Sequence, residues 1–325
     1  MEGYDMKKFY SRLMAGVILL NLFSGQVRAA DMLIPVGKVI GLELQNNTVT
    51  VAAFDKTSRA EAAGIQVGDR LLSIDGKPIT CAEDVRTALN QSSGTITITV
   101  QRGDDLSTLR LEPDISPQGP VLGIYLRQGV SGIGTVTYYD PETNTFGTLG
   151  HGVNDTSGAL LTMQGGYAYD AKIVAIRKGR SGEPGQLIGT LSAREPLGRL
   201  LRNTPQGVFG TMDKPISAEA LPVGDDETVK TGNATILSTI EGQLPKEYSV
   251  EILKIYPADR ANGRNLLIKV TDPILLEATG GIVQGMSGSP IIQDGKLIGA
   301  VTHVLVNDPT TGYGIFIENM LDAAV

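Results

Sequence analysis

From about residue 119 to its end, the sequence is a series of short apolar runs that alternate with polar residues and stop at Gly, Asn or Asp-Pro. This pattern is typical of short β-strands joined by tight turns. The expected strands span residues 134–139, 145–149, 160–161, 171–176, 186–190, 207–211, 234–240, 247–256, 265–271, 290–292, 297–303 and 312–317. The Gly- and Pro-rich stretch 177–232 is expected to hold mostly long surface loops, with a short helix at 196–202. So many short strands predict a barrel or a sandwich, not a parallel α/β sheet.

Residues 34–113 differ from this pattern because helix-like segments lie between the strand-like ones. They predict a separate compact domain, rich in β-strands and carrying two helices. A short helix over 58–63 ends at Gly64, a residue suited to a left-handed helix cap. A second, amphipathic helix over 81–91 places Val85, Ala88 and Leu89 on one face.

Composition excludes several classes of function. The net charge of -7 and the isoelectric point near 5.0, with no basic cluster, argue against nucleic acid as a partner. One cysteine and two histidines form no pattern typical of a metal site, and no glycine-rich run has the Lys-Ser/Thr ending of a phosphate loop. We therefore expect no metal and no cofactor.

The N-terminal residues 1–30 predict an export signal or an N-terminal membrane anchor. Lys7, Lys8 and Arg12 precede the apolar run 13–23, and small residues follow it. The run is shorter than the roughly 20 residues that cross a bilayer comfortably. The protein is therefore expected to act outside the cytoplasm, in association with a membrane.

The stretch GMSGSP at 285–290 predicts a catalytic serine. A serine hydroxyl needs a base to remove its proton, and the tetrahedral intermediate needs N–H donors aimed at its oxygen. Gly285 can adopt the backbone conformation that turns its N–H inward, and the N–H of Ser287 supplies the second donor. We therefore expect Ser287 to attack, and Gly285 with Ser287 to form the oxyanion hole. Ser289 is the rival nucleophile, but the spacing to Gly285 and Gly288 favours Ser287.

The string AGIQVGDRLLSIDGKPI, with the order of its strands and helices, resembles bacterial PDZ domains. In that family a peptide or C-terminal tail adds as a strand beside the second helix and is gripped by backbone amides of a hydrophobic-Gly-hydrophobic loop. The resemblance implies that Ile40, Gly41 and Leu42 form this loop, facing the helix at 82–91.

The stretch GMSGSPIIQDGKLIGAVTHV, with the later TGYGIFIE, resembles chymotrypsin-fold serine proteases, and the high-temperature-requirement proteases in particular. It implies that residues 119–325 form a double β-barrel peptidase domain. In that arrangement the base lies early, on the first barrel, which favours His151 in TLGHGVND. His303 lies on the strand after the serine and is expected to line the substrate groove or to fill a structural role instead.

The combination of these motifs with LGHGVND and NDPTTGYGIFIENML resembles the SpoIVB peptidase family of endospore-forming bacteria. The family pattern implies Asp272, 15 residues before Ser287, as the carboxylate that orients the histidine. The wider chymotrypsin group places its aspartate earlier in the chain, so Asp170 is an alternative, as is a Ser–His dyad. Asp155 is expected to cap a turn.

The same resemblance implies a role in sporulation signalling. The protein would be exported across the forespore inner membrane into the intermembrane space and would process itself. It would then cleave the inhibitory regulatory subunit of an intramembrane metalloprotease complex and so trigger pro-sigma-K processing. A non-catalytic PDZ adaptor on a protease-like scaffold is the alternative, and the presence of Gly285, Ser287 and His151 argues against it.

Overall fold

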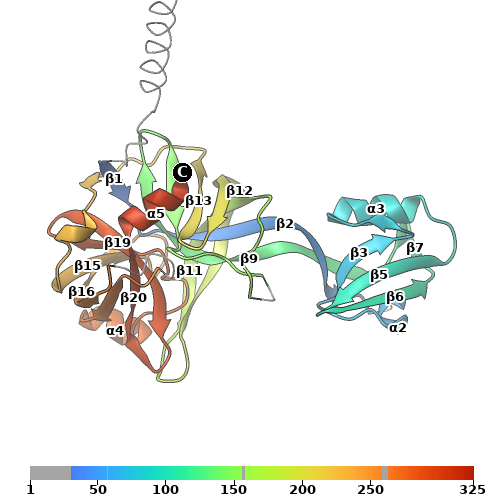
Figure 1. Ribbon diagram of the computed structural model, residues 1–325. Coiled ribbons are helices and arrows are strands. Elements are labelled where there is room, and N and C mark those ends of the chain that lie inside the picture. The colour runs from blue at the N-terminus through green and yellow to red at the C-terminus, as the bar shows by residue number, and fades with distance from the viewer. Residues whose placement is uncertain (1–30, 57, 156–157, 258–262) are drawn as a thin grey trace, which may run out of the picture. The chain divides into compact units, whose positions relative to one another are not determined.

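The computed structural model describes residues 31–325 except residues 57, 156–157 and 258–262. The expected export segment, residues 1–30, lies outside the described residues. The fold is mostly β, as predicted, and consists of a PDZ domain and two barrels (Figure 1). No helix among the described residues is long and apolar enough to span a bilayer.

The first barrel is a ring of strands in which each pairs with its neighbours in antiparallel fashion. In spatial order its members are β9 (Ile124–Asp140), β10 (Thr145–Thr148), β13 (Gly207–Met212), β12 (Gln186–Thr204), β11 (Gly165–Arg177) and β2 (Val39–Phe54). Pairing between β2 and β9 closes the ring. Two short strands, β1 (Met32–Pro35) and β14 (Leu221–Pro222), extend the sheet beyond β9.

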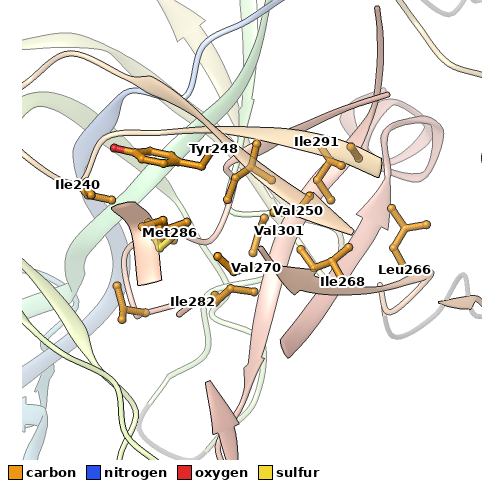
Figure 2. Packing of buried hydrophobic residues seen from close by; sticks show 14 of the residues in the cluster. Ile240, Tyr248, Val250, Leu266, Ile268, Val270, Ile282, Met286, Ile291 and Val301 are labelled. Atoms are coloured by element: carbon orange, nitrogen blue, oxygen red, sulfur yellow. The ribbon is translucent and has the colours of Figure 1, made fainter. Parts of the chain in front are cut away.

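The second barrel is closed as well, and it carries the larger core. In spatial order its strands are β15 (Gly232–Ser238), β16 (Lys246–Ile255), β17 (Leu266–Val270), β20 (Asp308–Phe316), β19 (Lys296–Leu305) and β18 (Pro290–Gln293). The other elements of this half are the 3-10 turn η1 (Asp226–Thr228) and the helices α4 (Pro273–Thr279) and α5 (Ile317–Ala324). Figure 2 shows side chains such as Val250, Ile268 and Val301 filling the barrel, together with Met286.

The PDZ domain lies between the two halves of the β2–β9 hairpin. Its elements are α2 (Arg59–Ala62), β3 (Arg70–Ile74), β4 (Lys77–Pro78), α3 (Ala82–Asn90), β5 (Ile96–Arg102), β6 (Asp105–Leu111), β7 (Asp114–Ser116) and β8 (Gly119–Val121). Its buried residues run from Val49 to Leu122 and form a core of their own. The two predicted helices appear as α2, capped by the Ser58 hydroxyl, and α3.

The structure corrects the predicted domain boundary. Residues 34–48 were expected in the PDZ domain, but Ile34, Ile40 and Leu44 pack in the core of the first barrel. The PDZ domain is therefore inserted into a hairpin of the peptidase domain and does not simply precede it.

This placement also shows that the expected peptide-gripping loop at Ile40, Gly41 and Leu42 was wrong. Ile40 lies opposite Asp170 of β11 on one side and opposite Gly134 of β9 on the other. A peptide can add only to a free strand edge, and both edges of β2 are occupied here.

The stretch 177–232 is more regular than predicted, because residues 186–204 form the long strand β12. The expected helix at 196–202 is wrong: Leu200 pairs with Gly166 of β11 and with Gly210 of β13. Pairing on both sides outweighs the local signals that favoured a helix.

Candidate active site

The turn at residues 285–288 connects the segment after α4 to β18, and its backbone requires glycine at two positions. Gly285 and Gly288 have φ angles of +100° and +96°. A Cβ on Gly288 would lie 2.0 Å from the carbonyl oxygen of Thr135. Between them, the Met286 side chain is fully buried in the second barrel and anchors the turn (Figure 2). Ser287 is thereby held at the surface of that core.

The two serines of this turn have different surroundings. The Ser287 hydroxyl is partly buried and donates to the carbonyl oxygen of Thr302 at 2.8 Å. The Ser289 side chain is fully buried, and its hydroxyl bonds to that of Ser238 at 3.1 Å. Of the two, Ser287 is among the residues that line the cavity shared with His151, and Ser289 is not.

Two backbone N–H groups in the turn around Ser287 differ from their neighbours in having no backbone acceptor among the described residues. The N–H groups of Met286, Gly288 and Ser289 are donated to backbone carbonyls. Within the described part of the chain, the N–H groups of Gly285 and Ser287 have no such acceptor. These are the two donors that the sequence predicts for an oxyanion hole.

His151 follows β10 after a backbone stretch in the left-handed region, with φ of +71° at Leu149 and +67° at Gly150. With its proton on Nδ1, the ring donates to the Gly152 carbonyl oxygen at 2.9 Å, which leaves a lone pair on Nε2. Burial lowers the pKa of His151, although the Gly152 carbonyl opposes this shift. The imidazole is therefore neutral near pH 7, as a general base must be.

His303 lies on β19, with its ring centroid 5.1 Å from that of His151. Burial, then repulsion from His151 and from Arg264, lower the pKa of His303 to about 4. Its Nδ1 is buried and has no hydrogen-bond partner among the described residues.

One cavity of about 450 Å³ brings these groups together. Its lining includes Gly285, Ser287, His151 and His303. Apolar side chains form most of the remaining wall: Leu42, Leu44, Val130, Ile133, Leu149, Val153, Ile282, Val283 and Val304. The wall contains no aspartate, glutamate, lysine or arginine within the described residues.

The structure does not bring the predicted carboxylates to this cavity. Asp272 caps α4 and accepts hydrogen bonds from the N–H groups of Ile274 and Leu275, at 2.9 and 3.0 Å. Asp170 forms an ion pair with Lys38 at 2.7 Å. Asp155 accepts from Ala159 N–H in a turn, as expected. The group that Nδ1 of His151 contacts is a backbone carbonyl.

A second hydrophobic-Gly-hydrophobic stretch lies at the end of the PDZ domain. Leu122-Gly123-Ile124 has the same hydrophobic-Gly-hydrophobic pattern, and its Leu122 belongs to the PDZ core. Gly123 has a φ of +63°, and its carbonyl oxygen accepts from Asp55 N–H at 2.9 Å. The same pattern can be read in the string VLGIYL, which lies after the boundary predicted for the domain.

Comparisons with known proteins match both the PDZ part and the peptidase part of the chain. The model of the family described as SpoIVB peptidase S55 matches residues 120–321, more than half of the chain, and a PDZ family matches residues 50–102. A putative zinc metalloprotease of Rhizobium meliloti is 40% identical over 86 residues, which are 26% of this chain and 23% of that protein. One of Neisseria meningitidis is 38% identical over 80 residues, 24% of this chain and 18% of that protein.

These metalloprotease matches are confined to the PDZ region, and the chain spans about a quarter or less of the length of these relatives. Among solved structures, the PDZ domain of the SdrC-like protein from Listeria monocytogenes is 21% identical, with a TM-score of 0.22. The match covers 25% of this chain and 87% of that one.

Proposed function

Because the chain belongs to the SpoIVB peptidase S55 family and is therefore a serine peptidase, we propose that Ser287 is its nucleophile and His151 its general base. The observation that supports this assignment is the shared cavity: Ser287, His151 and Gly285 line the same wall, and the N–H groups of Gly285 and Ser287 have no backbone acceptor within the described residues. Had Ser287 and His151 been on separate surfaces of the protein, this assignment would have been excluded.

The proposed reaction is acyl transfer in two steps. Nε2 of His151 takes the Ser287 proton in place of the Thr302 carbonyl, and Oγ attacks the scissile carbonyl carbon. The N–H groups of Gly285 and Ser287 bind the oxyanion. His151 then protonates the leaving amine, and a water molecule hydrolyses the acyl-enzyme by the same route. The Gly152 carbonyl takes the place of a carboxylate in holding the His151 tautomer, so the site works as a dyad.

The chemistry of the cavity wall indicates a substrate preference. Since the wall is mostly apolar and its polar members, such as Asn154 and Gln284, are uncharged, a charged substrate side chain would lose its hydration without gaining an oppositely charged partner. We therefore expect an apolar residue beside the scissile bond. Preferred cleavage of a peptide library next to Lys, Arg, Asp or Glu would contradict this expectation.

The family name implies sporulation, and the finer role stays a proposal. We propose that the protein is exported into the space between the forespore membranes and trims its own N-terminus. There it would cleave the inhibitory subunit of an intramembrane metalloprotease complex and thereby release pro-sigma-K processing. The PDZ domain would bind a peptide tail at Leu122-Gly123-Ile124, on the substrate or on a second copy of the chain.

Self-cleavage of the full chain tests the catalytic assignment. Ser287→Ala and His151→Ala should stay at full length on a gel, whereas Ser289→Ala should be processed like the natural protein. A fluorophosphonate probe, which reacts with activated serines, should label the natural chain and Ser289→Ala but not Ser287→Ala. Labelling or self-cleavage that persists in Ser287→Ala would show that another residue is the nucleophile.

A further inference from the structure

Thr135 connects the two parts of the catalytic site, although it lies outside the motifs that predicted it. It is a fully buried residue of β9, in the first barrel, and the 285–288 turn belongs to the second. Its hydroxyl donates to the Gly285 carbonyl oxygen at 2.8 Å, and its N–H donates to the Ser287 carbonyl oxygen at 3.0 Å. One residue thus holds the carbonyls on both sides of Met286.

The carbonyl oxygen of Thr135 faces the segment that carries His151. It accepts hydrogen bonds from the Thr148 hydroxyl at 2.6 Å and from Leu149 N–H at 3.3 Å. Leu149 has a φ of +71° two residues before His151, a conformation that persists only where the surroundings fix it. Every polar atom of Thr135 is therefore engaged either with the serine turn or with the histidine segment.

From these contacts we propose that Thr135 is a positioning residue: it fixes the Ser287 turn and the His151 segment relative to each other, in the arrangement that the reaction needs. This inference rests on the proposed roles of Ser287 and His151. Gly285 has no side chain and a positive φ, so its peptide planes rotate easily unless they are held. The Thr135 hydroxyl holds the carbonyl of Gly285, and so fixes the residue whose N–H is one of the two oxyanion donors.

Thr137 provides a matched comparison on the same strand. It is fully buried, lies two residues further along β9, and its hydroxyl has no partner within the described residues. Replacing either threonine by valine keeps the shape and the β-branching and removes one hydroxyl. Only at position 135 does that hydroxyl reach the site.

The experiment compares Thr135→Val, Thr135→Ser and Thr137→Val in the full chain. Two readouts are used: kcat and KM on a chromogenic ester with an apolar acyl group, and the rate of fluorophosphonate labelling. We expect Thr135→Val to lower kcat and the labelling rate by about 10- to 100-fold, as a misplaced catalytic group does, with KM nearly unchanged. Thr135→Ser should restore most of the rate, and Thr137→Val should match the natural protein.

Equal rates in Thr135→Val and Thr137→Val would overturn the proposal, as would a Thr135→Ser variant no faster than Thr135→Val. A change confined to KM would also contradict it. Should Thr135→Val not fold, as judged by circular dichroism, Thr135→Ala set against Thr135→Ser gives the same contrast. Activity that survives in Ser287→Ala would instead refute the nucleophile assignment, which separates the two failures.

Discussion

Gly288 shows how strictly single residues set the geometry of the site. The carbonyl oxygen of Thr135 lies 2.0 Å from where a Cβ would be, so any other residue would push the two barrels apart at this point. Gly295, in the next hairpin, also has a positive φ, +73°, but nothing within 4 Å of its Cβ position. The first glycine is required by contact between the barrels, and the second only by the local turn.

The pH dependence of activity is a prediction at the residue scale. Because burial lowers the pKa of His151, and a general base must be neutral, kcat/KM should rise with pH through a midpoint below the ordinary histidine value of 6.5. At pH 7 the base is then neutral, and activity is lost as the pH falls through that midpoint.

Initial rates of ester hydrolysis between pH 4 and pH 8 would measure this midpoint. The His303→Gln variant is the control, since it should keep the limb that belongs to His151. A midpoint above pH 6.5 would show that His151 does not titrate as the base. So would a His303→Gln variant in which kcat/KM no longer rises with pH.

At the scale of elements, α4 explains the position of Asp272 without a catalytic role. The helix begins with Asp272 at its N-cap, has Pro273 in its first turn and ends at Gly280, whose φ of +74° is that of a left-handed cap. An aspartate followed directly by proline is a strong local signal for a helix start. The family pattern had implied a catalytic group, whereas the structure gives this carboxylate three backbone donors, including Ser249 N–H.

Two substitutions at Asp272 separate the cap from catalysis. Asp272→Ala removes the cap and should lower the free energy of unfolding by about 1 kcal/mol, whereas Asp272→Asn should retain most of it, because asparagine caps as well. Both should keep kcat/KM of ester hydrolysis within about threefold of the natural value. Loss of an orienting carboxylate costs about 10⁴-fold in kcat. A decrease of that size in Asp272→Asn would show that Asp272 is the third member of a catalytic triad.

At the scale of the whole molecule, the chain enters the PDZ domain along β2 and leaves it along β9. The cores of the barrels contain none of the described residues between 45 and 129, and the PDZ core runs from Val49 to Leu122. Pairing of Leu44 with Val130 closes the hairpin on the barrel side of the insertion. Each core is therefore complete without the other.

Excision of the PDZ domain tests this separation. Replacing residues 46–128 with an Asn-Gly turn, which favours a two-residue hairpin, should leave a folded peptidase that still reacts with a fluorophosphonate probe. Residues 48–128 alone should fold cooperatively in a urea titration. An unfolded peptidase after excision would mean that the PDZ domain completes the barrel.

The sequence by itself determined the features that depend on neighbouring residues. Alternation of apolar and polar side chains gave the β class, and the glycines around Ser287 gave the turn and its two free donors, because backbone conformation is a local property. The prediction of His151 as the base came instead from the resemblance to chymotrypsin-fold proteases, and in the structure His151 and Ser287 line the same cavity.

Only the tertiary structure decided which strands pair across long separations. It assigned Ile40 and Leu42 to the first barrel, made a strand of residues 186–204, placed Asp272 on a helix end and set Thr135 against Gly285, 150 residues away. The physical reason is that strand pairing depends on partners distant in the chain, and local propensity gives way when both edges of a strand find them.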